Sequence, residues 1–353
     1  MRRVRTFTAF FVAILLFASA GRAQQKESLT TQYRAATDKI IDSAMKDTRG
    51  WEKLTHLTTH IGHRLSGSAQ LEQAIAWAAR TMREEGLENV RLQPVKVPRW
   101  VRGRESASVV APVEKPLAML ALGGSVATPR EGITAPVVVV SNFDELRALG
   151  RRRIAGKIVL YDVPFTNYGE TVRYRGEGAA RAAEFGAAAI LLRSVTPRSL
   201  YSPHTGAQDL RKGPPPIPAA AITVEDSAWI ARLVQAGKEV RVKLYMEAHF
   251  EPDADSANVM AEIVGLERPE EVVVLGGHYD SWDVGQGAED DGSGCMAAWQ
   301  AVTLLKQLGL RPKRTIRVVL WTNEENGLRG ARAYRQALGA GRSEEHTSEL
   351  QSR

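Results

Sequence analysis

One histidine and several carboxylates follow two apolar runs in the last third of the chain. His278 comes directly after the run VVVLGG, and Glu324 and Glu325 come shortly after the run RVVLW. Asp290 lies between them, in the stretch AEDDGSG. A neutral imidazole together with several carboxylates is a ligand set that suits zinc or a similar divalent ion. These residues therefore predict a metal site.

The elements around these residues are expected to bring them together. The segments EEVVVLGGH and RTIRVVLWTNEE are predicted to be strands, and CMAAWQAVTLLKQLGL is predicted to be an amphipathic helix between them. Apolar runs this continuous indicate a sheet covered on both faces, and the helical crossover is long enough for the two strands to be parallel. Open α/β sheets place their ligand crevices at the carboxyl ends of such strands, so the histidine and the carboxylates can converge at one edge.

Each of the three segments also has a purely structural interpretation. A single histidine after a strand can be a hydrogen-bonded structural residue, DDGSG can cap a helix, and NEE can be a polar loop. A calcium loop of the EF-hand type is a poor alternative, because its alternating Asp/Asn spacing before a Gly and its closing Glu are missing. The occurrence of all three at the ends of successive elements favours the metal site, in which Asp280 could orient the imidazole of His278.

The stretch GGHYDSWDVGQGAEDDGSG, followed by RTIRVVLWTNEENGLRG, resembles the co-catalytic zinc exopeptidase family, which includes bacterial leucyl aminopeptidases and glutamate carboxypeptidase. The resemblance continues upstream in IGHRLSGS, EGLENVRLQPVKVPRWVRG and LALGGSVATP, and it covers residues 30–340. It implies an α/β fold with a mixed sheet covered by helices, incomplete at the C-terminus, into which a small α/β protease-associated domain is inserted.

The resemblance also implies a role for each candidate residue in a centre of two zinc ions. His278 would bind one zinc ion, Asp290 would bridge both and Glu325 would bind the other. Glu324 would be the general base that takes a proton from the water bridging the metals, and Asp280 would support His278. The peptide bond that follows Asp290 is expected to be cis.

The function implied by the resemblance is a zinc-dependent exopeptidase that hydrolyses dipeptides or short peptides, with a homodimer as a possible assembly. An aminopeptidase of the same family is one alternative, because the metal ligands are shared and loops set the end specificity. A non-catalytic binding protein, like the transferrin-receptor-like relatives that have lost metal ligands, is the other. The retained His278, Asp290, Glu324 and Glu325 argue against it.

The N-terminus predicts export. Residues 1–23 combine a basic head, MRRVR, with the apolar run FTAFFVAILLFASA and small residues suited to cleavage, as in a secretory signal peptide. A secreted or periplasmic protein is expected, free of the membrane after cleavage. An uncleaved N-terminal anchor is the alternative.

Three further segments are predicted after the signal peptide. Residues 24–116 form a helical part of the peptidase domain, in which Leu71, Ile75, Ala78 and Met82 share one helix face that ends near Gly86. Residues 117–249 alternate apolar bursts with Gly and Pro, and are predicted to be the inserted protease-associated domain. Residues 250–341 form the metal-binding core.

Residues 342–353, with the sequence RSEEHTSELQSR, match nothing expected of the family and correspond to the translation of a sequencing adapter. The family pattern contains a further Asp and a further His after Glu325, and neither can be found. Each zinc ion would retain two protein ligands, whereas catalytic zinc normally has three and a water. We therefore expect the natural sequence to be represented only up to about Gly341, and the 353-residue chain to bind metal weakly and to be inactive.

The formal charge of +7 does not indicate a nucleic-acid partner. Four of the arginines lie in the predicted signal peptide, and the basic run at residues 151–153 has no interleaved aromatic residues, so a solvated loop is expected there. Cys295 is the only cysteine, which excludes an intrachain disulfide and predicts a buried thiol.

Several other residues could do chemistry but are assigned structural roles. His56 and His60 have the spacing of a helical metal pair, but neither they nor His63 match a ligand of the family. Two further histidines are expected at the surface, and two tryptophans either line the substrate pocket or pack: these are His204 and His249, and Trp100 and Trp282.

Overall fold

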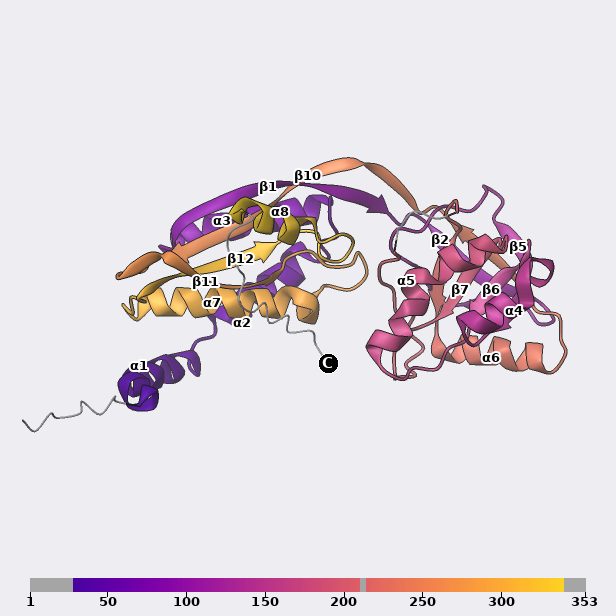
Figure 1. The fold of residues 1–353 in the computed structure, drawn as a ribbon, viewed down its shortest axis with the longest axis horizontal. Coiled ribbons are helices and arrows are strands. Elements are labelled where there is room, and N and C mark those ends of the chain that lie inside the picture. Colours follow the sequence, from indigo (N-terminus) through magenta and orange to yellow (C-terminus); the bar gives the residue numbers. More distant parts are fainter. Residues whose placement is uncertain (1–27, 210–213, 340–353) are drawn as a thin grey trace, which may run out of the picture. The chain divides into compact units, whose positions relative to one another are not determined.

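The computed structural model describes residues 28–209 and 214–339, so the predicted signal peptide and the predicted adapter-derived tail lie outside the described residues. The helix α1 (Leu29–Ala44) belongs to the first of two compact units. The second unit begins at Asp47 and contains two sheets, which Figure 1 shows with their helices. Within the described ranges, no helix combines the length and the apolar character that crossing a membrane requires.

The first sheet has four strands in the order β1-β10-β12-β11. Strand β10 pairs antiparallel with both β1 and β12, and β11 pairs parallel with β12, which confirms the predicted parallel arrangement. Strands β1 and β10 run side by side over most of their length (Figure 1). The bounds are β1 (Glu88–Val101), β10 (His249–Ile263), β11 (Arg268–His278) and β12 (Arg314–Trp321).

Different helices cover the two faces of this sheet. Successive side chains of a strand point to opposite faces, so neighbouring residues of β10 contact different helices. Val259 and Ala261 of β10 lie in the main core with α2 (Arg49–Thr55), α3 (Ala69–Glu84) and α7 (Gly294–Gln307). Met260, between them in sequence, faces the other way with Val319 and packs on α8 (Arg329–Leu338). A short helix, η1 (His56–Ile61), joins α2 to the segment before α3.

Helix α3 forms as predicted. Its residues Leu71, Ile75, Ala78 and Met82 are all buried, and the side chain of Ser68 caps its first turn by accepting a hydrogen bond from the backbone N–H of Leu71. The chain leaves the helix through Gly86, whose positive φ of 77° favours glycine.

The second sheet has eight strands in the order β3-β2-β9-β5-β6-β7-β8-β4. We call this sheet, together with its helices and loops, the insert. The strands β5, β6, β7 and β8 are parallel, α4 (Phe143–Ile154) and α5 (Tyr168–Glu184) cover one face, and α6 (Val224–Gln235) packs on the other. The bounds are β2 (Glu105–Ala111), β3 (Lys115–Leu117), β4 (Met119–Ala121), β5 (Ile133–Val140), β6 (Ile158–Tyr161), β7 (Ala189–Arg193), β8 (Ala219–Ile222) and β9 (Arg241–Met246).

The segment predicted as the helical part, residues 24–116, is helical only up to α3. It then contributes β1 to the first sheet, and β2 with most of β3 to the insert, so the predicted boundary at residue 117 falls within the strands of the insert. The strand character of β1 was not predicted, although only six of its fourteen residues are polar or charged. Three of its side chains are buried, and its pairing partner, β10, lies far along the chain.

Two smaller expectations were also wrong. The apolar run of β11 predicted a strand covered on both faces, but β11 is an edge strand of the described sheet, and Val273 and Val274 are 45% and 38% exposed. The arginines at residues 151–153 are exposed as predicted but lie in the last turn of α4 rather than in a loop. The positive φ of Gly150 interrupts the helix just before them, which obscured the helical pattern.

Candidate metal centre

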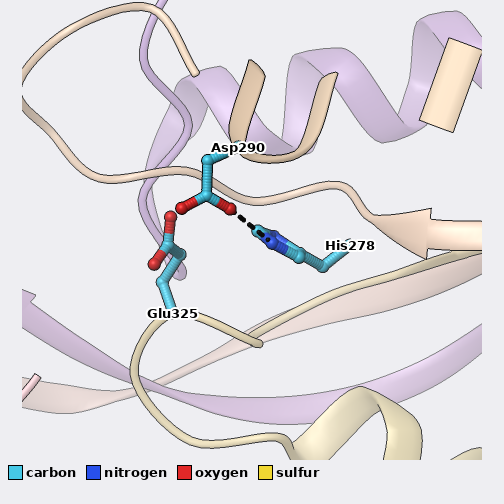
Figure 2. Close-up of side chains that lie close together, drawn as sticks. All are labelled: His278, Asp290 and Glu325. Carbon is cyan, nitrogen blue, oxygen red and sulfur yellow. Dashed lines mark hydrogen bonds and ion pairs between the residues drawn. The ribbon is translucent and has the colours of Figure 1, made fainter. Parts of the chain in front are cut away.

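Three segments that are separate in sequence meet at the carboxyl ends of β11 and β12. His278 is the last residue of β11, Glu325 follows β12, and Asp290 lies in η2 (Ala288–Ser293), just before α7. Each offers a ligand atom, and these atoms all lie within 4.8 Å of one another. Figure 2 shows the ring of His278 directed at Asp290, with the carboxyl group of Glu325 beside it. The convergence predicted from the strand ends is therefore present.

Hydrogen bonds fix both nitrogens of the His278 ring. Nδ1 lies 3.0 Å from the backbone oxygen of Asp280, and Nε2 lies 2.9 Å from Oδ1 of Asp290. Burial alone would lower the pKa of His278. The hydrogen bond to Asp290 and the charges of Asp280, Glu324 and Glu325 outweigh burial and raise the pKa to about 10. The ring is thus surrounded by enough negative charge to attract a cation.

Asp280 is completely buried and connects the two strand ends. Its carboxylate accepts hydrogen bonds from the backbone N–H groups of Glu324 (2.9 Å) and Glu325 (3.2 Å), and from the hydroxyl of Ser66 (3.1 Å). The carboxylate lies 3.9 Å from Nδ1 of His278, whose nearer partner is the backbone oxygen of Asp280. The side chain therefore orients the turn after β12 more directly than it orients the imidazole.

The turn that carries Asp290 is held by its neighbour Asp291, and the peptide bond between them is cis, as expected. Oδ2 of Asp291 accepts a hydrogen bond from the backbone N–H of His278 at 3.1 Å. A Cβ at Gly277 would lie 2.1 Å from the same oxygen, so this contact requires glycine there. The hydrogen bond with His278 lowers the pKa of Asp290 against the effect of burial, and the charges of His204 and Arg175 lower it further.

The two glutamates after β12 have different surroundings. Burial and the neighbouring charges of Asp290 and Asp280 raise the pKa of Glu325 to about 9. The side chain of Glu324 is 46% exposed, and its Oε2 lies 3.9 Å from Nε2 of His278. Glu325 thus faces the cluster of ligand atoms, whereas Glu324 lies at its open side.

This donor set fits a divalent cation. It combines one imidazole nitrogen with carboxylate oxygens, the ligands found in zinc sites. The raised pKa values of His278 and Glu325 show that the metal-free arrangement retains protons where its negative charges are not balanced. A bound cation would balance the negative charge of the carboxylates, which the protons on His278 and Glu325 balance in the metal-free protein.

The supporting residues around the site were not predicted. Arg64 and Ser66 reach the centre from the segment before α3, and Asn323 donates a hydrogen bond to the hydroxyl of Ser66 at 3.1 Å. Their signal was available in the motif IGHRLSGS, which carried part of the resemblance without an assigned role. Only the fold shows that this motif lies beside Asp280.

The remaining candidates have structural surroundings. The rings of His56 and His60 stack on each other at 5.0 Å, and His56 also stacks on Trp77. His204 and His249 are exposed, as expected. Cys295 is buried, as predicted, and its thiol lies 3.1 Å from the backbone oxygen of His278.

The two tryptophans pack against each other. Trp100 is 3% exposed, its indole N–H donates to the backbone oxygen of Ser125, and its ring meets that of Trp282 edge to face. Of the two predicted roles, lining a pocket or packing, these contacts favour packing.

Two family models match the chain. Residues 258–348 match Peptidase family M28, and residues 120–230 match the PA domain. The first match contains His278, Asp290 and Glu325, and the second lies within the insert.

The chain is also similar to known proteins along most of its length. It is 51% identical to carboxypeptidase Q of Xenopus laevis over 320 residues, which is 89% of this chain and 68% of the relative. Among solved structures, a peptidase M28 precursor from Shewanella amazonensis matches with a TM-score of 0.84 and 35% identity, covering 87% of this chain and 71% of that one. A zinc aminopeptidase from Bacillus subtilis matches in fold, with a TM-score of 0.61, 23% identity, and coverage of 84% and 65%.

The fold, the matched family model and the site define the class: the chain belongs to peptidase family M28, a family of metallo-exopeptidases, and carries an inserted PA domain. Within this class it is similar to the carboxypeptidase Q proteins of several vertebrates, at 45% to 53% identity. The chain spans between 60% and 73% of the length of those relatives.

Proposed function

We propose that this protein is an exported, zinc-dependent exopeptidase that hydrolyses dipeptides or short peptides, of the carboxypeptidase Q type. The convergence of His278, Asp290 and Glu325 within 4.8 Å carries the proposal, because it joins an imidazole and two carboxylates from three separate segments. The identity to carboxypeptidase Q supports the peptide substrate, and the zinc aminopeptidase that shares the fold supports the choice of metal. The signal-peptide sequence at residues 1–23 supports export to the periplasm or the medium.

In this proposal, His278, Asp290 and Glu325 would hold two zinc ions, with Asp290 as the shared ligand. When bound, zinc lowers the pKa of water and polarises the scissile carbonyl. Glu324, with its carboxylate at the open side of the cluster, accepts the proton of the attacking water and passes it to the leaving amine. Asp280 holds the backbone of Glu324 and Glu325 in place through its two hydrogen bonds.

The ligand set among described residues contains three side chains for two ions. Catalytic zinc normally has three protein ligands of its own, so we propose that the 353-residue chain binds zinc weakly and does not turn over substrate.

An aminopeptidase of the same family is the second candidate. A probable leucine aminopeptidase 2 of Aspergillus fumigatus is 29% identical over 283 residues, and the Bacillus subtilis enzyme shares the fold. Comparison of dipeptides blocked at either end distinguishes the two, because a carboxypeptidase requires a free carboxyl terminus and an aminopeptidase a free amino terminus.

The test uses a chimera in which Gly341 is followed by the part of the Xenopus laevis relative that lies C-terminal to the corresponding position. The 353-residue chain is assayed in parallel. We expect the chimera to hydrolyse dipeptides in a chelator-sensitive way, and its Glu324→Gln variant to lose this activity while keeping its zinc. Glu267→Gln, an exposed glutamate away from the site, is the matched control and should remain active.

Each part of the proposal has its own contrary result. A chimera that binds zinc without hydrolysing peptides would favour a non-catalytic binding protein. Unchanged turnover in Glu324→Gln would refute the assignment of the base, and robust hydrolysis by the 353-residue chain would refute its predicted inactivity.

A further inference from the structure

The segment that joins two of the ligands, residues 279–287, is held from both sides. We call it the ligand connection, because it runs from His278 to the η2 turn with Asp290. On one side lies Arg64, whose side chain is completely buried. Its guanidinium donates to the backbone oxygens at both ends of the connection, Tyr279 (3.0 Å) at the start and Gln286 (2.8 Å) and Gly287 (3.0 Å) at the end.

On the other side, Arg102, which lies between β1 and β2, contacts the middle of the connection through an ion pair. Arg102 donates from Nε and Nη2 to the two carboxylate oxygens of Asp283, each at 2.7 Å. Arg102 is only 9% exposed, and its Nη1 donates to the backbone oxygen of Ala121, at the end of β4 in the insert. Such a bidentate pair fixes orientation as well as distance.

A second contact from the insert acts on the neighbouring residue. The ring of Trp282 lies so close to the backbone of Gly123 that a Cβ at this position would be 2.0 Å from its Cη2 atom. Trp282 also meets Trp100 edge to face, with ring centroids 6.4 Å apart. The absence of a side chain at Gly123 is thus what allows the indole to dock against the insert.

We propose that Arg102, which is anchored on the insert through Ala121, and Gly123 of the insert are positioning residues, which hold Asp283 and Trp282 and so fix the ligand connection between His278 and Asp290. The side chain of Asp290 is 66% exposed, so packing around this side chain contributes little to fixing its position. The insert therefore contributes to metal binding without supplying a ligand. This inference rests on the proposed metal function, but its central effect is measurable without metal.

A general contribution of these contacts to stability would give a different pattern. Loss of a contact that contributes only to overall stability would destabilise the insert and the first sheet alike. Loss of a positioning contact would loosen the connection selectively, because local opening requires far less free energy than global unfolding.

The experiment measures amide hydrogen exchange of the metal-free chain and, separately, zinc affinity by competition with a chromophoric chelator. Asp283→Asn removes the charge of this side chain while keeping the shape of the side chain. Gly123→Ala introduces a Cβ that displaces the indole of Trp282 from the backbone of the insert. Gly169→Ala is the matched control, since a Cβ there meets only Asn167 Oδ1, at 3.6 Å, on the exposed first turn of α5.

We expect both variants to speed exchange in residues 279–291 about tenfold while strands β6 and β12 keep their protection. Zinc affinity should fall about tenfold, the lower end of the effect of outer-shell changes. The control should match the wild type in both measurements.

Unchanged exchange in residues 279–291 in both variants would overturn the proposal. So would an equal loss of protection throughout both sheets, because it would show a general structural role. If neither the wild-type chain nor the chimera binds zinc, the proposed function fails, while the exchange data still decide whether the insert fixes the connection.

Discussion

The insert and the first sheet both place acidic residues directly after parallel strands, but they treat these residues differently. In the insert, Asp162 follows β6 and accepts hydrogen bonds from Arg193 (3.0 Å) and from the hydroxyl of Ser227 (2.7 Å). In the first sheet, Asp280 follows β11, and Glu325 follows β12. The cationic side chain paired with the carboxylates of that cluster is His278.

The difference indicates how a common topology can give a structural site in one sheet and the proposed metal site in the other. A carboxylate with a guanidinium partner is neutralised within the fold, as Asp162 is. Burial and neighbouring carboxylates instead raise the pKa of Glu325 to about 9. The ionised form of Glu325 would therefore be stabilised by a bound cation. Strand ends thus provide the location, and the two sites differ in the partner of the carboxylate: the guanidinium of Arg193 for Asp162, and the imidazole of His278, a side chain that can also bind metal, for Asp290.

The largest expected effect is the loss of metal binding on removal of the imidazole. His278→Ala should lower zinc affinity by more than about 100-fold, because loss of an outer-shell partner alone costs about 10 to 100-fold. Competition with a chromophoric chelator measures it. His249→Ala, which removes an exposed imidazole at the start of β10, should leave the affinity unchanged. Equal affinities for the two variants would remove His278 from the ligand set.

Glu325→Gln should stabilise the metal-free protein at high pH. The folded pKa of Glu325, about 9, lies above its ordinary value of 4.5, so its contribution to stability is full below pH 4.5 and is lost as the pH rises toward 9. Gln does not titrate, so the variant should gain on the order of 2 kcal/mol near pH 8 and nothing near pH 4.5.

Urea unfolding in the presence of a chelator, at both pH values, measures this gain. Glu267→Gln, an exposed glutamate paired with Lys313, is the control and should show no gain that depends on pH. A Glu325→Gln variant that is less stable than the wild type at pH 8 would contradict the proposed contrast, in which Asp162 is stabilised by Arg193 and burial disfavours the ionised form of Glu325.

Asp162→Asn should destabilise the insert without affecting the metal centre. The variant loses the ion pair with Arg193 but can still accept the hydrogen bond from Ser227, so the expected cost is about 1 kcal/mol. Urea unfolding measures the cost, and the zinc competition assay should give the wild-type affinity. A marked loss of zinc affinity would show that the two carboxylate sites are not independent.

The smallest effect is expected at Asp47, another carboxylate with a guanidinium partner. The hydrogen bond from Arg49 lowers the pKa of Asp47 from 3.8 to about 2, so its stabilisation is present above pH 3.8 and is lost as the pH falls through 2. Asp47→Asn should cost less than about 1 kcal/mol at pH 7, because Arg49 is partly exposed to solvent. The difference from the wild type should vanish near pH 2 in an acid titration followed by circular dichroism.

Local sequence was sufficient for elements whose pattern is complete within a short segment. The spacing of Leu71, Ile75, Ala78 and Met82 predicted α3, and the alternation of strand and helix predicted the parallel pair β11 and β12. The strand β1 was missed because it pairs with β10, which lies far along the chain, and its own residues carry no information about this partner. The same holds for β2, whose partner β9 is distant in sequence.

By itself, the sequence determined the residue types at the strand ends, and hence the chemistry that His278, Asp290 and Glu325 can do. Tertiary structure decided which groups hold them: the carboxylate of Asp280 binds backbone groups more than forty positions away, and Arg64 reaches residues more than two hundred positions away. The physical reason is that side-chain hydrogen bonds and ion pairs depend on distance in space. The sequence pattern of one strand or turn shows only which groups are available, and the folded chain decides which of them meet.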